Sequence, residues 1–550
     1  MIAGIGPLRR GPPAIRALIL GLGLVLLGTG AGGAAQDLVA LARVGPWPGV
    51  SELIGYRERL WFVNSVKFVN HNSADLYSYD PATGTVRYER HLFSQDAGQP
   101  TVAGGLLFWP FEDARFSAGR GEYMVTNGRD WQWRALPDGV AFHLHAMTRM
   151  GAPLFAATSA WRAGLQRSDD LGRSWRVLYD HPTEPGFVSR ITSLGALGET
   201  LYAGLTAWAQ AGVKLLRLEG DKVTPVAGWP QGKSTRALTS WRGWIYAVNS
   251  DDRESGLWRT DGGAVERIGA LDGEQVRALA GGEEALWLVS IGKAGGALWR
   301  SRDGLAWERA QSLGDEPLDL AVFAGRVYVG ALGADGQGAL WGPPAPAPAP
   351  MLPAAAPPPL PAPSPPLGER RLRGLLEELD RVLVDARSYA PRGRAILRAL
   401  GALVGSGRPR VGAALSERLG APFPAIEVAL FGGNLEIPAA TLARWYLMRA
   451  IALSGGGRVP AALLAAPFGA PPNGAEKYFE AAPGAAFAAA QLGQGDDETL
   501  AALIDRLGHE GDPLWLVGDV VGALSALSGE RLGYDREAWR AWWRRRHRAD

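Results

Sequence analysis

Two histidines come closest to a chemical motif in this sequence. His143 and His145 are one residue apart, so on a β-strand both imidazoles would lie on one face, about 7 Å apart at a rise of ~3.3 Å per residue. The pair could bind a metal ion, but no third ligand stands nearby, and zinc sites use three or four protein ligands. We expect the two histidines to line a channel and hold ordered water, and we predict no metal and no cofactor.

Composition excludes several kinds of chemistry. The chain has no cysteine, which removes disulfides, thiol nucleophiles and cysteine zinc sites. The net charge is +2 over 550 residues, so composition gives no support for a nucleic-acid partner. Because no nucleophile or phosphate-binding motif is evident either, we predict no catalytic residue and leave enzymatic activity uncertain.

The chain between residues 37 and 342 is built from repeats. A pair made of an apolar residue and a following aromatic residue recurs every 41 to 47 residues. A second marker, a Leu or Tyr, follows the start of each pair at a distance of 11 to 16 residues. Short apolar or alternating runs separated by Gly, Asp, Asn and Ser predict four strands per repeat, which is the make-up of a propeller blade. We therefore predict an all-β, seven-bladed propeller. The pairs begin at Leu60, Leu107, Leu154, Leu201, Ile245, Leu286 and Val327, and the second markers are Leu76, Tyr123, Leu165, Leu215, Leu257, Leu298 and Leu340.

The seventh repeat lacks its fourth strand, because the chain reaches Pro343 first. An open outer edge is a liability for a soluble propeller. We predict that residues 37–44, with the sequence DLVALARV, fill this place and close the ring.

Two turns between third and fourth strands share a pattern. Ser168, Asp170, Gly172 and Trp175 stand in SDDLGRSW, and a version one residue shorter contains Ser301, Asp303, Gly304 and Trp307. Ser and Asp can bond the backbone of the turn, Gly can take a positive φ, and Trp can pack into the blade. The pattern resembles the Asp-box (BNR repeat) of sialidase-like propellers, and the resemblance implies a structural role for these residues. Catalytic sialidases also carry an Arg-Ile-Pro motif that this chain lacks, so a divergent glycoside hydrolase remains the alternative.

The loops that join second to third strands are long and rich in aromatic residues, and they share one face with the loops that enter each blade. Aromatic side chains on a rigid scaffold suit sugar stacking or protein contacts. An equally open alternative is that the tryptophans only cover the propeller core. The candidate binding residues are Phe68, Phe111, Phe116, Trp161, Arg162 and Trp208.

Both ends of the propeller adjoin segments of different composition. Residues 1–35 contain basic residues, a short apolar run and small residues, and they resemble a bacterial signal peptide. This predicts export to the periplasm or the cell exterior, with an uncleaved N-terminal anchor as the alternative. Residues 343–366 form a Pro-rich linker that favours an extended spacer.

Residues 367–550 predict an all-α region, either a helical bundle or an α-solenoid. The end of the chain resembles the terminal unit of HEAT-like repeat proteins. In this unit Asp535 would cap a helix with Trp539, Trp542 and Trp543 on one face. Arginines flank these tryptophans, so the helix could lie on an anionic membrane, although a solvated capping helix is the simpler interpretation.

Taken together, the sequence predicts an exported, non-catalytic binding or scaffold protein. Its partner would be a protein or a carbohydrate at the loop face, with no nucleic acid and membrane contact only through an uncleaved signal. The alternatives are the glycoside hydrolase named above and an assembly factor for an envelope complex.

Overall fold

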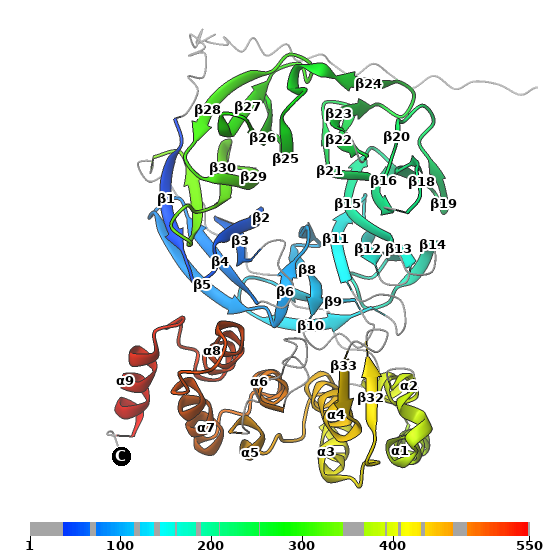
Figure 1. Ribbon diagram of the computed structural model, residues 1–550, viewed down its shortest axis with the longest axis vertical. Helices are drawn as coiled ribbons and strands as arrows, with labels where there is room; N and C mark the ends of the chain where they lie inside the picture. The colour runs from blue at the N-terminus through cyan, green and yellow to red at the C-terminus, as the bar shows by residue number, and fades with distance from the viewer. Residues whose placement is uncertain are drawn as a thin grey trace, which may run out of the picture. The chain divides into compact units, whose positions relative to one another are not determined.

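A computed structural model describes residues 37–66, 73–114, 121–136, 143–159, 162–182, 189–207, 209–251, 254–344, 368–390, 393–404, 409–430, 435–465 and 481–547. Within these ranges, residues 39–342 pair into seven antiparallel blades arranged as a ring (Figure 1). Each blade has four strands that run outward from the central axis. From the centre outward, the strands of blade 1 are β2 (Gly49–Tyr56), β3 (Arg59–Ser65), β4 (Ala74–Asp80) and β5 (Thr85–His91). Blade 2 has a divided inner strand, β6 (Ser94–Ala97) and β7 (Thr101–Ala103), followed by β8 (Leu106–Ala114), β9 (Glu122–Thr126) and β10 (Trp131–Ala135). The strands of blade 3 are β11 (His143–Arg149), β12 (Leu154–Ser159), β13 (Arg162–Ser168) and β14 (Arg176–Pro182).

The remaining four blades repeat this order. Two short strands, β17 (Gly212–Val213) and β20 (Gln231–Gly232), pair beside blades 4 and 5, and η1 (Gly269–Leu271) follows blade 5. The strands of blades 4 to 7 are β15 (Ser189–Leu197), β16 (Thr200–Ala207), β18 (Leu215–Glu219) and β19 (Lys222–Pro225); β21 (Ser234–Trp241), β22 (Trp244–Ser250), β23 (Ser255–Thr260) and β24 (Val265–Ile268); β25 (Gln275–Gly281), β26 (Leu286–Gly292), β27 (Gly295–Ser301) and β28 (Glu308–Leu313); β29 (Glu316–Phe323), β30 (Arg326–Leu332), β31 (Gly338–Gly342) and β1 (Val39–Val44).

The repeat seen in the sequence corresponds to the second and third strands of the blades. The apolar-aromatic pairs all lie in second strands and the second markers all lie in third strands; for example, Tyr202 lies in β16 and Leu215 in β18. Their side chains fill the space between neighbouring blades, where Tyr202, Leu215 and Leu238 share one apolar cluster. The prediction of a seven-bladed propeller is confirmed.

The ring is closed by the strand from the amino-terminal side. β1 pairs antiparallel with β31 and becomes the fourth strand of blade 7, as the sequence predicts. Just before β1, the Leu38 amide donates to Gln311 Oε1 at 2.7 Å, and Gln311 Nε2 donates to the Leu38 carbonyl at 2.8 Å. Arg43 adds an ion pair with Asp315 at 2.7 Å. These contacts remove the open edge that three strands alone would leave.

The SDDLGRSW turn joins β13 to β14 and is held by its own polar side chains. Ser168 Oγ accepts from the Gly172 amide at 2.8 Å, and Asp170 Oδ1 accepts from the amides of Arg173 and Ser174. Gly172 has a φ of +80°. The equivalent turn from Ser301 repeats this arrangement, with Asp303 Oδ1 accepting from the amides of Leu305 and Ala306.

The turn also joins neighbouring blades. Trp175 packs edge-on against Tyr123 of blade 2, with ring centroids 5.9 Å apart, and donates to its hydroxyl. Tyr123 in turn donates to the Gly172 carbonyl at 2.8 Å. The sequence predicts that the Trp of this turn packs into the blade. Trp175 lies against an apolar cluster that includes Leu144 and Leu154 of its own blade, and it also contacts Tyr123 of the preceding blade.

The Gly172→Ala variant is expected to be less stable than Gly198→Ala. Both glycines have a positive φ, which costs roughly 1–2 kcal/mol for a residue with a Cβ. An added Cβ at Gly172 would also lie 2.7 Å from Tyr123 Oη, whereas Gly198 has open space. Urea denaturation of the two variants should therefore differ by about 1 kcal/mol or more, the size of a lost hydrogen bond. Equal stabilities would contradict the role of Tyr123.

The region after the linker is helical. η2 (Ala386–Tyr389), η3 (Arg418–Gly420) and a hairpin of β32 (Glu427–Leu430) and β33 (Leu435–Pro438) lie between its α-helices. None of the described helices has both the length and the apolar character needed to cross a bilayer. The helices are α1 (Glu369–Val384), α2 (Arg394–Val404), α3 (Pro409–Glu417), α4 (Ala439–Ser454), α5 (Ala461–Leu464), α6 (Ala481–Leu492), α7 (Asp497–Leu507), α8 (Leu514–Ser528) and α9 (Arg536–Arg546).

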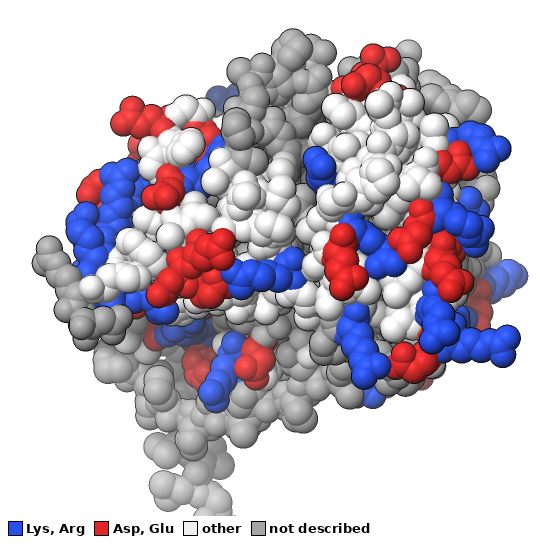
Figure 2. Space-filling view, turned by 90° about the horizontal axis from the view of Figure 1, so that it is seen from below, with Lys and Arg blue, Asp and Glu red and all other residues white. Residues whose placement is uncertain are grey.

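The helices form two rows (Figure 1). In the inner row, α2 contacts α4, α4 contacts α6, and α6 contacts α8. In the outer row, α5 contacts α7, and α7 contacts α9. Across the rows, the contacting pairs are α1 with α2, α3 with α4, α5 with α6, and α7 with α8. These helices lie within residues 367–550, the region that the sequence predicts to be all-α. The Asp535 cap is also confirmed, since its side chain accepts from the Ala538 amide at 2.9 Å. Figure 2 shows acidic and basic side chains next to one another on the face seen from below.

The inner row packs against the outer strands of blades 1 and 2. Residues 37–550 form one compact unit, in which α8 contacts β5. Phe487 of α6 packs edge-on against Phe93 and Trp133 of the propeller, with ring centroids 5.2 and 5.0 Å apart. We call this contact between propeller and helices the junction.

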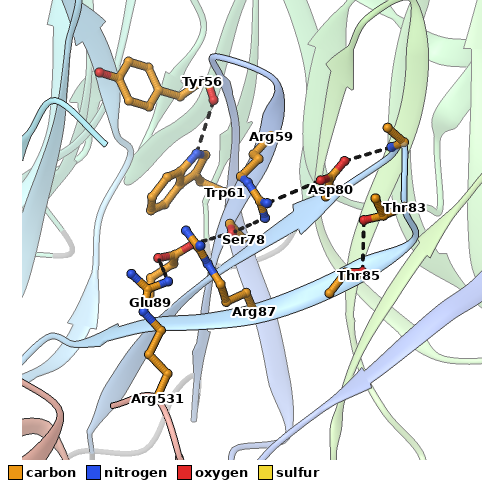
Figure 3. A network of polar contacts seen from close by, with 11 residues as sticks. Tyr56, Arg59, Trp61, Ser78, Asp80, Thr83, Thr85, Arg87, Glu89 and Arg531 are labelled. Carbon is orange, nitrogen blue, oxygen red and sulfur yellow. Dashed lines mark hydrogen bonds and ion pairs between the residues drawn. The ribbon is translucent and has the colours of Figure 1, made fainter. Parts of the chain in front are cut away.

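Arginine–glutamate ion pairs cross the junction. Glu89 of β5 accepts from Arg531 at 3.0 Å and also from Arg87 and Ser78 (Figure 3). Deeper in, Arg449 of α4 donates to Glu122 of β9.

Candidate functional site

The antiparallel order of the strands defines two faces of the propeller. The inner strand of each blade starts on one face, so the loops between second and third strands return to that same face. The turns between third and fourth strands, including those at Ser168 and Ser301, lie on the other. We call the first the loop face and the second the turn face.

Every undivided inner strand contains a bulge at the same place. The register against the second strand shifts in blades 1, 3, 4, 5, 6 and 7, and in blade 2 the inner strand is split into β6 and β7. In blade 3 the shift falls between Leu144 and Ala146, so His145 is the extra residue. A bulge re-aims the side chains near it, which here lie around the loop-face end of the central axis.

Five polar residues meet at this end from three successive blades. Glu112 lies near the end of the second strand of blade 2, and Arg190 lies near the start of the inner strand of blade 4. His143, His145 and Ser159 come from blade 3. Arg190 Nη1 lies 3.6 Å from Glu112 Oε1, and His145 Nε2 lies 2.8 Å from Ser159 Oγ. The imidazoles of His143 and His145 stack with centroids 5.5 Å apart. We call these five residues the mouth cluster.

Both imidazoles are neutral at neutral pH. Burial lowers the pKa of His143 to about 4, with Glu112 opposing and Arg190 reinforcing the shift. Burial also lowers the pKa of His145 well below its ordinary value, assisted by the neighbouring His143 and Arg190. The cluster therefore carries one positive and one negative charge, on Arg190 and Glu112.

The charged pair is partly open to solvent. The side chains of Arg190 and Glu112 are 40% and 27% exposed, and their 3.6 Å separation is longer than a hydrogen bond. Both groups are therefore accessible to a ligand from the loop face. Arg190 provides hydrogen-bond donors, Glu112 provides an acceptor, and the stacked imidazoles provide an apolar ring face. The charges of Arg190 and Glu112 cancel, so the cluster has no net charge.

Most of the predicted aromatic binding residues cannot be placed. Phe68, Phe116, Trp161 and Trp208 lie outside the described residues, as does the side chain of Arg162. Phe111 is described, and its prediction as an exposed loop residue is wrong. β8 extends through it, and its fully buried ring packs against Trp133 with centroids 4.6 Å apart.

No known protein family matches the chain by its family model, and no curated protein matches its sequence. Similar solved structures contain propellers. The β-propeller domain of the Trilobed protease from Pyrococcus furiosus has 12% identity and a TM-score of 0.40, over 54% of this chain and 95% of that chain. A chain of the Mitotic Checkpoint Complex has 10% identity and a TM-score of 0.39, over 60% and 99%.

Pyrococcus horikoshii acylaminoacyl peptidase has 9% identity and a TM-score of 0.37, over 52% of this chain. The match spans about half (51%) of the peptidase chain. At this level of identity the likenesses concern the fold alone.

The sequence pointed to only part of the mouth cluster. The prediction that both histidines lie on the first strand at the channel agrees with their position on β11. Glu112, Ser159 and Arg190 were not predicted as site residues, because each is an isolated polar residue at a strand end. No group of three or more His, Asp or Glu among the described residues could hold a metal ion.

Proposed function

We propose that this chain is an exported, non-catalytic scaffold protein that engages a protein or carbohydrate partner at its loop face. The observation that carries the proposal is the mouth cluster, where three blades place a partly exposed ion pair beside two neutral imidazoles. Binding sites commonly combine an apolar surface with a few convergent polar groups. Since this site has no net charge, it suits sugar hydroxyls or peptide amides, which both donate and accept hydrogen bonds.

The rest of the architecture is consistent with a scaffold. The predicted Asp-box turns, the closing strand and the junction each fix one part of the chain to another. A rigid framework lowers the entropy that a binding surface loses when a partner docks. The helical region, which we propose to be HEAT-like, adds a second surface to the same unit.

The double variant Glu112→Ala/Arg190→Ala is expected to reduce partner binding at least tenfold. The control is Arg176→Ala/Asp221→Ala, which removes an exposed ion pair on the turn face. Both variants and the parent would be compared in photo-crosslinked capture from the native envelope and on a glycan array. Equal binding by the parent and the mouth variant would contradict the proposal, whereas loss in both variants would indicate a general defect.

Export is part of the proposal and has its own test. Cell fractionation and amino-terminal sequencing of the native protein should place it outside the cytoplasm and begin it near residue 35. An intact amino terminus in the membrane fraction would instead support the uncleaved anchor.

One observation favours a divergent glycoside hydrolase as second candidate. Asp96 of β6 lies opposite Glu112 of β8, and opposed side chains on paired strands have Cβ atoms about 4.5–5.5 Å apart. Glycoside hydrolases use two such carboxylates. Asp96 is almost fully buried, however, and accepts from Ser65 at 2.8 Å. A panel of fluorogenic glycosides separates the candidates: turnover abolished by Glu112→Gln would favour the hydrolase.

A further inference from the structure

His91 lies at the centre of the junction and bonds to both sides of it. Its side chain is fully buried at the end of β5. Nδ1 lies 2.8 Å from Asp75 Oδ1 on β4, and Nε2 lies 2.9 Å from Asp519 Oδ1 on α8. One ring therefore connects a carboxylate of the propeller with a carboxylate of the helical region.

The hydrogen bonds around the ring identify its charge state. Asp75 Oδ2 accepts from Trp47 Nε1 at 3.0 Å and from the Tyr534 hydroxyl at 2.7 Å, so three donors including His91 stabilise this carboxylate. An ionised carboxylate only accepts hydrogen bonds. A carboxylate faces each ring nitrogen, and when both carboxylates are ionised the ring satisfies both contacts only as the imidazolium, with two N–H groups.

Helix α8 is shaped around the ring. A Cβ at Gly518 would lie 3.0 Å from His91 Cε1, and one at Gly522 would lie 2.5 Å from His91 Cβ. These two positions share a helix face because they are four residues apart. Asp519 therefore reaches His91 from a slot formed by two residues without side chains.

We infer that His91 is a buried imidazolium that locks the helical region onto the propeller, and that the lock opens when the ring loses a proton. Burial lowers the pKa of His91, but the two carboxylates outweigh this effect and hold it above its ordinary value of 6.5. A raised pKa in the folded protein gives stability that is complete below 6.5 and is lost as the pH rises through the raised value. The junction should therefore weaken on the alkaline side.

Among the other groups around the ring, only Arg90 has a pKa shifted toward the same alkaline range, to about 10 through burial, and loss of the step in His91→Gln separates the two. Burial raises the pKa of Tyr77, Tyr88 and Tyr534 well above the ordinary value of 10, so they stay neutral through the range in question. Arg90 neighbours His91 on β5, but it lies over the Trp131 ring, 5.7 Å from its centroid. The titratable groups that contact His91 directly are Asp75 and Asp519.

Nitrogen NMR of the full chain tests the charge state of the ring directly. With ¹⁵N-labelled histidine, the His91 signals are identified by their absence in His91→Gln. We expect both ring nitrogens to carry protons at pH 7 and one to lose its proton only at alkaline pH. A His91 ring with one bare nitrogen at pH 6 to 7 would overturn the inference.

A distance measurement tests the opening of the junction. Because the chain has no cysteine, Thr83→Cys and Glu510→Cys would place one label on the propeller and one on the helical region. Energy transfer should fall in a single-proton step as the pH rises, and His181→Gln, which changes a half-buried histidine on β14, should keep this step. His91→Gln should abolish the step. The same step in His91→Gln, or no step in the parent, would overturn the lock.

The slot gives a second arm to this experiment. Gly522→Ala should lower energy transfer at every pH, because its methyl group would meet His91. Gly374→Ala on α1 is the matched control, since a Cβ there has no neighbour within 4 Å. Unchanged energy transfer in Gly522→Ala would contradict the packing of α8 on His91.

Discussion

Replacing Arg449 with methionine is expected to lower the free energy of unfolding by about 3–5 kcal/mol. Arg449 and Glu122 are 6% and 0% exposed, and they form an ion pair across the junction. Loss of the arginine would leave the carboxylate buried, with the Trp133 indole N–H at 3.0 Å as a remaining donor. A buried charge without its counter-charge is far more costly than an absent pair, so the effect should exceed that of any surface ion pair.

A second ion pair across the same junction provides the control. Arg531 donates to Glu89 at 3.0 Å, but its side chain is 42% exposed. Arg531→Met should therefore cost no more than about 1 kcal/mol. Adding Glu122→Met to Arg449→Met should recover much of the loss, because the double variant has no buried charge. Similar denaturation midpoints for Arg449→Met and Arg531→Met would contradict the special role of the buried pair.

The propeller could be predicted from the sequence because its signals are local and repeated. The second and third strands of every blade have similar sequences, so residues equivalent to Leu201 and Leu215 are found in all seven repeats. The closing strand followed from a count: blade 7 lacked one strand, and residues 37–44 were the remaining strand-like segment. Neither inference required knowledge of a contact between distant side chains.

The junction could not be predicted in the same way. His91 and Asp519 are 428 residues apart, and either could have been a solvated side chain. Helix α6 also gives little signal of its own in the sequence, because AAPGAAFAAAQL is buried on nearly all sides and shows no polar face. The alternation of apolar and polar residues on which helix prediction depends is absent there.

The candidate site falls between these cases. His143 and His145 attracted attention through their spacing, but Glu112 and Arg190 reach them only through the ring geometry and the bulges. Phe111 was predicted to lie on the loop that follows the second strand of its blade. β8 in fact continues to Ala114 and buries the ring.

Leu38→Asp is expected to destabilise the protein by several kcal/mol, whereas Val39→Asp should change stability by less than about 0.5 kcal/mol. The two residues are adjacent at the start of the closing strand, but Leu38 is 3% exposed and Val39 is 42% exposed. Leu38 lies in an apolar cluster with Val289, Leu298 and other side chains of blades 6 and 7. A carboxylate there would have no counter-charge in the cluster, and the closing strand would be weakened.

Thermal denaturation and hydrogen exchange together test this prediction. In Leu38→Asp, the midpoint should fall and the amides of β31 should lose protection, because β1 is their outer partner. Val39→Asp adds the same charge one residue away and should retain both properties. If the two variants behaved alike, closure of the ring would not depend on the inward side chain of residue 38. The N-terminal strand would then be an accessory to a propeller held together by its first three strands in blade 7.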